Sequence, residues 1–412
     1  MISPKLCVKC KGKLLCGLSY CPILKSHSEK QKALAGIEGT SFTGSSPPSI
    51  FVSWKQYPKV QIAPLAPTSV FDSSMLDLPE KWFGLSQEEI VSFRGQLLMS
   101  NKRIDAREAA KPGNELSEMQ LLAMAAEPTA IDVKLKSVPS MEISFHESVA
   151  PIGPSAPMLS MHLQENPSIA KKIDYAVADT DLKANNALVT LYEAGFPLSK
   201  LHKLLSAGTL GIGKNRRLTP TRWSIVAADD AVCKSLIDEI KGRQHLGEVQ
   251  LFSSEYLGNR FFILLVPGPW SFENLETWIP GSMWYQEKDA ANIHIIQDHE
   301  FYSGRKAYAS NVEGAYYAAR LSVCEHLRKE KRQAAAIVFR EITPEYSLGL
   351  GVWVIRESVK DALRKKPLSF SDLNLALAFI EKKLLTPFNL WRKESKLLDF
   401  LLHQKKLSDF GK

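Results

Sequence analysis

The residues of this chain that point most directly to a chemistry are four cysteines near its N-terminus. Their spacing is C-x2-C-x5-C-x4-C, at Cys7, Cys10, Cys16 and Cys21. Zn2+ binds four soft ligands in a tetrahedron, and such short spacings let a single stretch of backbone surround one ion. A disulfide pair is the alternative, but disulfides are rare in a reducing cytosol. The pattern therefore predicts a zinc-binding module, and the lysines between its cysteines favour contact with nucleic acid.

A second candidate is a glycine- and arginine-rich stretch over residues 205–230. Three glycines precede four basic residues, and an apolar, strand-like run then ends on two carboxylates, Asp229 and Asp230. Glycine lets backbone N–H groups approach a ligand closely, and guanidinium groups match phosphate oxygens in pairs. The stretch predicts a site for phosphate or a nucleic-acid backbone, and the alternative is a surface hairpin whose basic tip is solvated. The basic residues are Lys214, Arg216, Arg217 and Arg222.

Titratable side chains near the ends of elements are candidates for catalysis. His146 and Glu147 follow an alternating strand pattern and precede a proline-rich loop, and such strand ends often carry active-site residues. An ordinary hydrogen-bonded loop histidine is the alternative. Glu313 lies at the start of a long helical stretch. With Asp229 and Asp230, these residues are the candidate acid–base groups of an enzyme whose reaction the sequence does not specify.

The C-terminal residues 404–412 contain the pattern Q-x-x-h-x-x-aromatic, at Gln404, Leu407 and Phe410. In a 3-10 turn, positions three apart eclipse each other, so Leu407 and Phe410 would form one apolar plug. The pattern resembles the peptide by which replication and repair factors dock on the sliding clamp, proliferating cell nuclear antigen (PCNA). Gly411 stands where many such peptides carry a second aromatic residue. The alternative is that Leu407 and Phe410 extend the packing stripe of the preceding helix.

The elements around these candidates follow from hydrophobic periodicity. Strand patterns, such as residues 131–135 and 261–266, alternate with amphipathic helical stretches, which predicts a mixed α/β body. Residues 182–193 and 198–205 form two short helical stretches before the basic segment. This arrangement is typical both of a DNA-binding helix-turn-helix with a wing and of a plain helical hairpin.

Local sequence patterns also predict individual helices, a strand and the environment of two cysteines. Ser86 and Glu89 form a capping box that starts a helix. The run at residues 351–355 predicts a strand, and two helices, over residues 372–385 and 390–402, are expected to close the chain. Cys233 and Cys324 stand alone in apolar helical contexts and are expected to be core thiols.

The length of 412 residues exceeds what one core fills, so several units are expected. Shifts in composition divide the chain into a zinc module, a linker with the first strands, two halves of the α/β body, C-terminal helices and a clamp-binding peptide. The corresponding ranges are 1–35, 36–70, 71–230, 231–366, 367–403 and 404–412.

The net charge of +8 is concentrated at the two ends of the chain. Residues 1–32 carry seven basic residues and one acidic residue, and residues 360–412 carry twelve and six. Basic ends favour contact with an anionic polymer, and improved solubility is the alternative. No apolar run approaches the roughly 20 residues needed to span a bilayer, and no signal peptide is evident. We therefore expect a cytoplasmic, nucleoid-associated protein that does not contact membranes.

Taken together, these patterns resemble the archaeal Nre family of DNA repair proteins. The segments that carry the resemblance are the cysteine-rich head, residues 47–52, 146–148, 217–224, 267–271 and 314–320, and the tail. The resemblance implies a role in DNA damage repair, a four-cysteine zinc finger, and clamp binding through Gln404, Leu407 and Phe410. It implies no catalytic residue.

The leading hypothesis is a repair factor that binds DNA electrostatically and is tethered to the sliding clamp by its tail. The second hypothesis is an enzyme that acts on nucleic acid or a nucleotide through the central glycine- and arginine-rich stretch. A third, an RNA- or transcription-associated zinc protein, fits the cysteine-rich head but leaves the tail unexplained.

Overall fold

The computed structural model describes residues 10, 13–15, 21–139, 153–282 and 293–403. The chain divides into two compact units. Among the described residues, the N-terminal unit contains those up to Val232 together with Leu348–Leu350, and the C-terminal unit contains the others, from Cys233 to His403. Helix α8 (Thr221–Lys241) begins in the first unit and ends in the second.

The N-terminal unit contains a six-stranded mixed sheet. Neighbouring strands are antiparallel except for one parallel pair, β4 with β6. Across the sheet the strands are β1 (Ser41–Ser46), β5 (Thr129–Leu135), β6 (Ser155–Leu163), β4 (Leu98–Asp105), β3 (Lys59–Ala66) and β2 (Ile50–Val52). The β5 side chains alternate between buried and exposed, so one face of the sheet supplies a core.

Helices of the N-terminal unit form the second part of its core. Leu188, Leu201, Leu204 and Ala228 meet in a cluster of apolar side chains from α5 to α8. The helices that precede α8 are α2 (Pro22–Leu34), α3 (Gln87–Gly95), α4 (Asn114–Met124), α5 (Lys171–Ala178), α6 (Ala184–Glu193) and α7 (Leu198–Ser206). Short 3-10 turns are η1 (Ser74–Asp77), η2 (Pro79–Lys81), η3 (Ala106–Ala110) and η4 (Gly213–Asn215).

The C-terminal unit is built on a second six-stranded mixed sheet, in which only β10 and β13 pair in parallel. Its strands are, in spatial order, β11 (Ile295–Glu300), β10 (Ser271–Trp278), β13 (Ala335–Ile342), β9 (Asn259–Val266), β8 (Val249–Tyr256) and β14 (Leu368–Phe370). A separate two-stranded pair joins β7 (Gln244–His245) to β12 (Arg332–Gln333).

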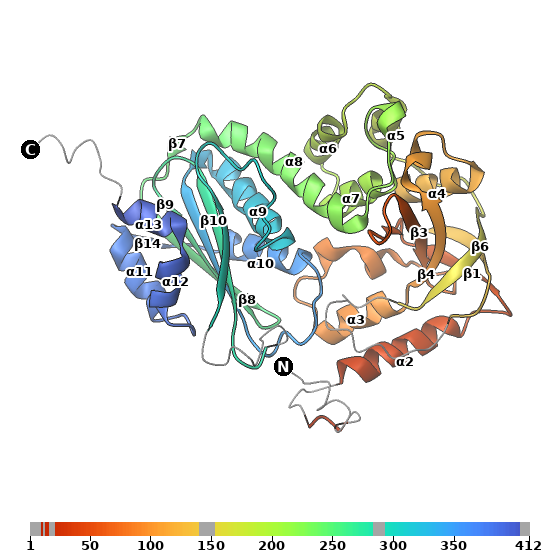
Figure 1. The fold of residues 1–412 in the computed structure, drawn as a ribbon, viewed down its shortest axis with the longest axis horizontal. Helices are drawn as coiled ribbons and strands as arrows, with labels where there is room; N and C mark the ends of the chain where they lie inside the picture. Colours follow the sequence, from red (N-terminus) through yellow and green to blue (C-terminus); the bar gives the residue numbers. More distant parts are fainter. Residues whose placement is uncertain (1–9, 11–12, 16–20, 140–152, 283–292, 404–412) are drawn as a thin grey trace, which may run out of the picture. The chain divides into compact units, whose positions relative to one another are not determined.

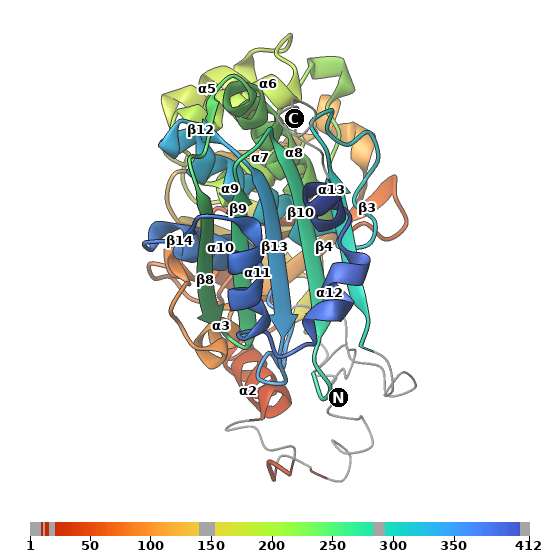
Figure 2. The ribbon, with the colours of Figure 1, turned by 90° about the vertical axis from the view of Figure 1, so that its left-hand side faces the viewer.

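Helices cover both faces of this second sheet (Figures 1 and 2). On one face lie α9 (Gly314–Glu330) and α10 (Trp353–Arg364). On the other lie α11 (Leu373–Glu381), α12 (Phe388–Glu394) and α13 (Lys396–His403), whose apolar side chains form a core with the sheet. The unit is therefore a three-layer α/β/α arrangement, and the expected mixed α/β body and helical C-terminus are confirmed.

Two strand predictions are wrong, because both runs belong to helices with one buried face. The strand-like run before Asp229 is part of α8, in which Ala228, Val232 and Leu236 are buried at helical spacing. Residues 351–355 end in a helix rather than a strand: α10 begins at Trp353. In both cases the tertiary packing of an amphipathic face outweighs weak local propensity.

One other expectation differs in detail. The predicted helix over residues 390–402 is two helices, because the Ser395 hydroxyl caps α13 by accepting a hydrogen bond from the Leu398 N–H (3.0 Å). The capping box of Ser86 and Glu89 at the start of α3 is confirmed. The predicted clamp-binding peptide lies outside the described residues, and so do Cys7 and Cys16 of the predicted zinc module.

Candidate functional site

The basic segment forms the loop between α7 and α8. Backbone hydrogen bonds fix it at both ends: the Gly213 N–H donates to the Thr180 carbonyl (2.8 Å), and the Leu218 N–H donates to the Ala106 carbonyl (2.9 Å). Gly208 has φ +69°, and a Cβ at this position would lie 2.8 Å from the Arg217 carbonyl oxygen. The loop therefore requires glycine at position 208 for its own backbone conformation, whether or not a ligand binds.

The arginines of this loop divide into structural and outward-facing groups. The Arg216 guanidinium donates to the carbonyls of Gly211 (2.9 Å) and Val177 (2.6 Å), which ties the loop to α5. Burial lowers the pKa of Arg216. Arg217 donates to the carbonyl of Arg216 itself (2.7 Å). Arg216 therefore holds the loop in place and does not project toward a ligand.

Lys214 and Arg222 are exposed, Lys214 within η4 and Arg222 in the first turn of α8. Arg217 is half-buried beside them in sequence. The structure thus brings Lys214, Arg217 and Arg222 to the surface of one loop and helix start. Cationic side chains on a rigid loop can contact phosphate oxygens without first ordering the backbone.

The two predicted carboxylates are not part of this surface. Asp229 is fully buried, and its Oδ1 lies 3.1 Å from Nε2 of the buried His202 in α7. Asp229 follows Arg222 by about two helical turns, which is roughly 10 Å along the helix axis. Asp230 is half-buried on the same helix. Because α8 is a helix, the side chains of Asp229 and Asp230 point in different directions. Asp229 contacts His202 and so joins α8 to α7.

Helix α7 is the element that a helix-turn-helix would insert into DNA, but it is enclosed by its own unit. None of its residues is exposed. Lys200 Nζ donates to the Ala123 carbonyl (2.7 Å), and Lys203 Nζ pairs with the buried Asp77 (2.9 Å). A recognition helix needs an accessible face with side chains that reach the bases. The plain helical hairpin is the arrangement that the structure shows.

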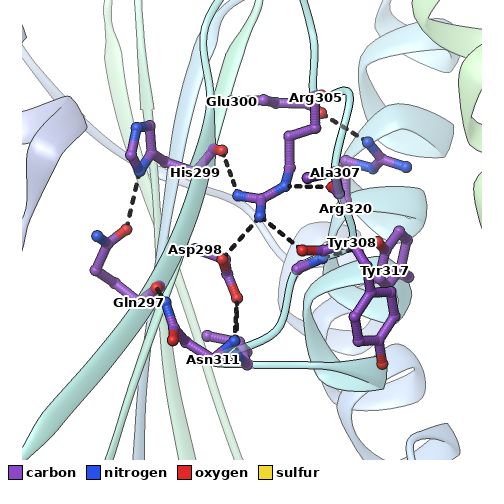
Figure 3. Close-up of polar contacts among 12 residues, drawn as sticks. Gln297, Asp298, His299, Glu300, Arg305, Ala307, Tyr308, Asn311, Tyr317 and Arg320 are labelled. Carbon is purple, nitrogen blue, oxygen red and sulfur yellow. Dashed lines mark hydrogen bonds and ion pairs between the residues drawn. The ribbon is translucent and has the colours of Figure 1, made fainter.

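A dense polar cluster in the C-terminal unit was not predicted from the sequence. It joins β11 to the segment that leads into α9 (Figure 3). The Asp298 carboxylate accepts hydrogen bonds from the N–H groups of Asn311 (2.9 Å) and Val312 (2.8 Å) and pairs with Arg305 (2.9 Å). Arg305 also donates to the carbonyl of His299 (2.7 Å). These contacts fix the segment between β11 and α9.

A buried ion pair extends this cluster into α9. Arg320 Nη1 lies 2.7 Å from Oε2 of Glu300, whose Oε1 accepts a hydrogen bond from Trp270 Nε1 (3.0 Å). The Arg320 guanidinium lies over the rings of Tyr316 (5.3 Å) and Tyr317 (5.4 Å). Burial and the Glu300 carboxylate raise the pKa of Tyr316 well above its ordinary value. At neutral pH, Tyr316 is therefore a neutral phenol beside a paired carboxylate.

This framework determines the conformation of the predicted candidate Glu313. Glu313 directly precedes α9 and has φ 55° and ψ −133°, a combination that a residue with a side chain rarely adopts. Its side chain is exposed. Such a conformation costs on the order of 1–3 kcal/mol and persists only where surrounding contacts impose it. The contacts of Asp298 with Asn311 and Val312 immediately before Glu313 supply that constraint.

Polar side chains also follow alternate positions of β10, on the face toward α9. Asn274 Nδ2 donates to Glu276 (3.2 Å), and Arg340 of β13 pairs with Glu276 (3.0 Å) and donates to Asn259. Among the described residues, the buried Asn274 Oδ1 and Trp278 Nε1 have no hydrogen-bond partner. The sequence signal that could have revealed this row is a run of polar residues, Glu273, Asn274, Glu276 and Thr277, inside an otherwise strand-like segment.

The remaining predicted residues are described only in part. His146, Glu147, Cys7, Cys16, Gln404, Leu407 and Phe410 lie outside the described residues. Cys10 is buried and Cys21 directly precedes α2. Within the described ranges, no group of three or more histidine, cysteine, aspartate or glutamate side chains could hold a metal ion. No helix in the described part of the chain is long and apolar enough to cross a membrane.

Comparison with known proteins places these elements in a family context. Two family models match: "Archaeal Nre, N-terminal" over residues 15–285 and "Archaeal Nre, C-terminal" over residues 300–410. The chain is 35% identical to a protein of Archaeoglobus fulgidus named DNA repair protein NreB, over 95% of this chain and 96% of that protein. No solved structure shows a significant match.

Two further relatives are named DNA repair protein NreA. One, also from Archaeoglobus fulgidus, is 38% identical over 92% of this chain and 93% of the relative. The other, from Haloferax volcanii, is 35% identical over 79% of each chain. Because both family models and these relatives together span nearly the whole sequence, the chain belongs to the archaeal Nre family.

Proposed function

We propose that this protein is a DNA repair factor that binds DNA and docks on the sliding clamp through its C-terminal peptide. The observation that carries the proposal is its similarity, over most of its length, to three proteins named for DNA repair. Similarity across both units indicates that the whole architecture is shared, rather than one common domain.

The clamp-binding part of the proposal rests on where the C-terminal pattern begins. Helix α13 ends at His403, and Gln404 is the next residue. Leu397 and Leu398 of α13 are buried in the core of the C-terminal unit, so they anchor the helix that precedes the pattern. A clamp bound at this pattern would therefore be tethered to a helix that is anchored in the folded unit.

DNA binding is proposed for the exposed Lys214 and Arg222 and the half-buried Arg217, which lie in the α7–α8 loop and at the start of α8. The rigid attachment of the loop through Arg216 supports this assignment, because the cations are held without a ligand.

The N-terminal cysteines are proposed to hold one structural Zn2+ ion. The residues that the structure describes fit this role, since Cys10 Sγ accepts a hydrogen bond from the Leu15 N–H (3.3 Å). An N–H donor stabilises the thiolate, which is the form of cysteine that binds metals. Cys7, Cys10, Cys16 and Cys21 would be the ligands, and the ion would supply the folding free energy of a segment too short for its own core.

A salt titration tests DNA binding. Binding of the purified protein to a labelled flapped duplex is measured by anisotropy between about 50 and 300 mM salt. The logarithm of the affinity should fall linearly with the logarithm of salt concentration, by about 0.9 for each phosphate contact. Affinity that does not change with salt, or an absence of binding at low salt, would contradict the proposed DNA contact.

An enzyme acting on nucleic acid or a nucleotide is the second candidate function. The strained conformation of Glu313, with its exposed carboxylate at the head of α9, favours this candidate. The protein is incubated with damaged, flapped and cross-linked DNA, with and without divalent metal ions or ATP. Turnover that disappears in Glu313→Gln would support the enzyme. No product across the panel, at enzyme concentrations equal to substrate, would exclude these reactions.

A further inference from the structure

The exposed aromatic side chains of the N-terminal unit include three that come from two neighbouring elements. Trp54 is 50% exposed, Tyr57 44% and Trp223 45%, whereas Trp82 and Trp270 are fully buried. Tryptophan is among the residues most often covered in folded proteins, so a group of exposed aromatic rings marks a binding surface. We call Trp54, Tyr57 and Trp223 the aromatic face.

The aromatic face combines two elements that are far apart in sequence. Trp54 and Tyr57 lie in the turn between β2 and β3, and Trp223 lies in the first turn of α8. The Tyr57 and Trp223 rings have centroids 5.2 Å apart and planes inclined by 54°. A tilted pair leaves parts of both ring faces open, so that another planar group can pack against them.

Backbone contacts hold the two elements together. The Val52 N–H donates to the Thr221 hydroxyl (2.9 Å), which fixes the end of β2 to the start of α8. The Ala106 N–H donates to the Pro58 carbonyl (2.8 Å), and the Ala106 carbonyl accepts from the Leu218 N–H (2.9 Å). The turn, η3 and the basic loop are therefore joined through one residue, and the aromatic face is arranged before any ligand binds.

Cations flank the aromatic face on both elements. Lys55 and Lys59 are exposed in and beside the turn, and Arg222 is exposed next to Trp223. Arg107 of η3 is also exposed but forms an ion pair with Asp105 (2.7 Å), so part of its charge is neutralised. Asp105 also attracts Lys59. These four basic residues outnumber Asp105, so the face has a positive character that favours an anionic partner carrying flat rings.

We propose that the aromatic face binds single-stranded DNA, with unpaired bases stacked on Trp54, Tyr57 and Trp223 and phosphates contacting Lys55, Lys59 and Arg222. This inference rests on the proposed role in DNA repair and specifies the form of DNA. Rings can stack only on bases whose faces are open, and paired bases inside a duplex are already stacked on each other. Helix α7 has no exposed residue and therefore cannot insert into the major groove of a duplex.

The test compares labelled single-stranded oligo(dT) of about 20 nucleotides with a duplex and an RNA strand of equal length. Anisotropy titrations use the full-length protein, Trp223→Ala and Trp54→Ala, with Trp223→Phe as the conservative variant that keeps a ring. Tyr175→Ala is the matched control, because Tyr175 is 70% exposed in α5 of the same unit but outside the aromatic face. Circular dichroism and thermal melting check the fold of each variant.

Loss of one stacked base costs about 1–3 kcal/mol, so each alanine variant should bind oligo(dT) about 5- to 150-fold more weakly. Trp223→Phe should recover most of the affinity, and Tyr175→Ala should bind like the parent protein. Duplex binding should be weaker than oligo(dT) binding and should change less than about twofold in the alanine variants.

Folded alanine variants that bind oligo(dT) like the parent protein would overturn the inference. Equal losses for duplex and single strand would also overturn it, and tighter binding of RNA would assign the face to RNA instead. Salt-dependent duplex binding that is unaffected by Trp223→Ala would leave the proposed DNA repair function in place while removing this inference, so the two failures are distinguishable.

Discussion

The sulfur atoms of Cys233 and Cys324 lie 3.2 Å apart, although 91 residues separate them in the sequence. They come from α8 and α9 of the C-terminal unit, and both side chains are fully buried. Burial and the neighbouring Cys233 thiol raise the pKa of Cys324 well above its ordinary value. A buried protonated thiol is a poor nucleophile, so this pair should be chemically silent in the folded protein.

This relationship predicts a stepwise thiol titration of the six cysteines. In the native zinc-loaded protein, a thiol-reactive chromophore should react slowly with all six. A zinc chelator should release four rapidly reacting thiols and one equivalent of Zn2+, because metal binding protects the ligand thiolates. Denaturant should then expose the remaining two. Release of all six by the chelator alone would show that the Cys233–Cys324 pair is not buried as described.

Replacement of Asp77 should strongly destabilise the N-terminal unit. The buried Asp77 carboxylate lies between Arg94 (2.8 Å) and Lys203 (2.9 Å). Removal of one partner from a buried ion pair costs about 3–5 kcal/mol, so Asp77→Asn should lower the free energy of unfolding by that amount at pH 7. Urea denaturation measures it, and Asp181→Asn, an exposed carboxylate in the same unit, is the control.

The difference in unfolding free energy between the parent protein and Asp77→Asn should depend on pH. Burial opposes ionisation of Asp77, but the charges of Lys203 and Arg94 outweigh burial and lower its pKa. The stabilisation is therefore complete above the ordinary carboxyl pKa of about 3.8 and is lost as pH falls through the lower pKa of the folded state. The unfolding free energies of the parent protein and Asp77→Asn should converge in acid. A constant difference down to pH 2 would contradict this account.

Glu273 should produce the opposite pH dependence in the C-terminal unit. Burial raises its pKa to about 7, despite hydrogen bonds from the Ser395 hydroxyl and the Lys396 N–H (2.8 Å). A raised carboxyl pKa favours the folded state most at low pH, and this contribution falls as pH rises from about 4.5 to 7. Over that interval the parent protein should lose about 3 kcal/mol of unfolding free energy relative to Glu273→Gln. If the unfolding free energies of the parent protein and Glu273→Gln change in parallel with pH, the pKa of Glu273 is not raised.

Replacement of Arg216 should reduce stability, whereas replacement of Lys214 should weaken DNA binding without reducing stability. Arg216→Ala leaves the carbonyls of Gly211 and Val177 without their donor and should lower the unfolding free energy by about 2 kcal/mol. Lys214→Ala should leave stability unchanged and reduce the slope of log affinity against log salt by about 1. Thermal melting and salt titrations of both variants test this. Equal effects of the two variants on DNA binding, with no effect on stability, would contradict the structural role of Arg216.

The sequence predicted those parts of the fold that depend on local patterns. The capping box of Ser86 and Glu89 and the alternation along β5 have short-range physical causes, and the structure contains both. The residues around Trp353, where α10 begins, predict a strand, because valine and isoleucine favour strands unless one face of a helix is buried. Only the tertiary contacts of that face decide between the two.

Relationships between distant segments could not be predicted. Ser395, which separates α12 from α13, donates a hydrogen bond to Glu273 of β10, and the proximity of Tyr57 to Trp223 creates the aromatic face. Each depends on which strands and helices become neighbours, and no residue spacing encodes that choice. At the candidate site, sequence indicated the cations Lys214 and Arg222 but not that Arg216 is committed to backbone carbonyls or that Asp229 is buried.

The most direct test of the central claim is a calorimetric titration of the protein with its cognate sliding clamp. The full-length chain is compared with a chain ending at His403 and with a full-length Leu407→Ala, Phe410→Ala variant. Binding by the full-length chain that disappears in both altered proteins is the predicted result, because the docking residues follow α13. Equal binding by all three proteins, or no binding by the full-length chain, would contradict clamp docking through the C-terminal peptide.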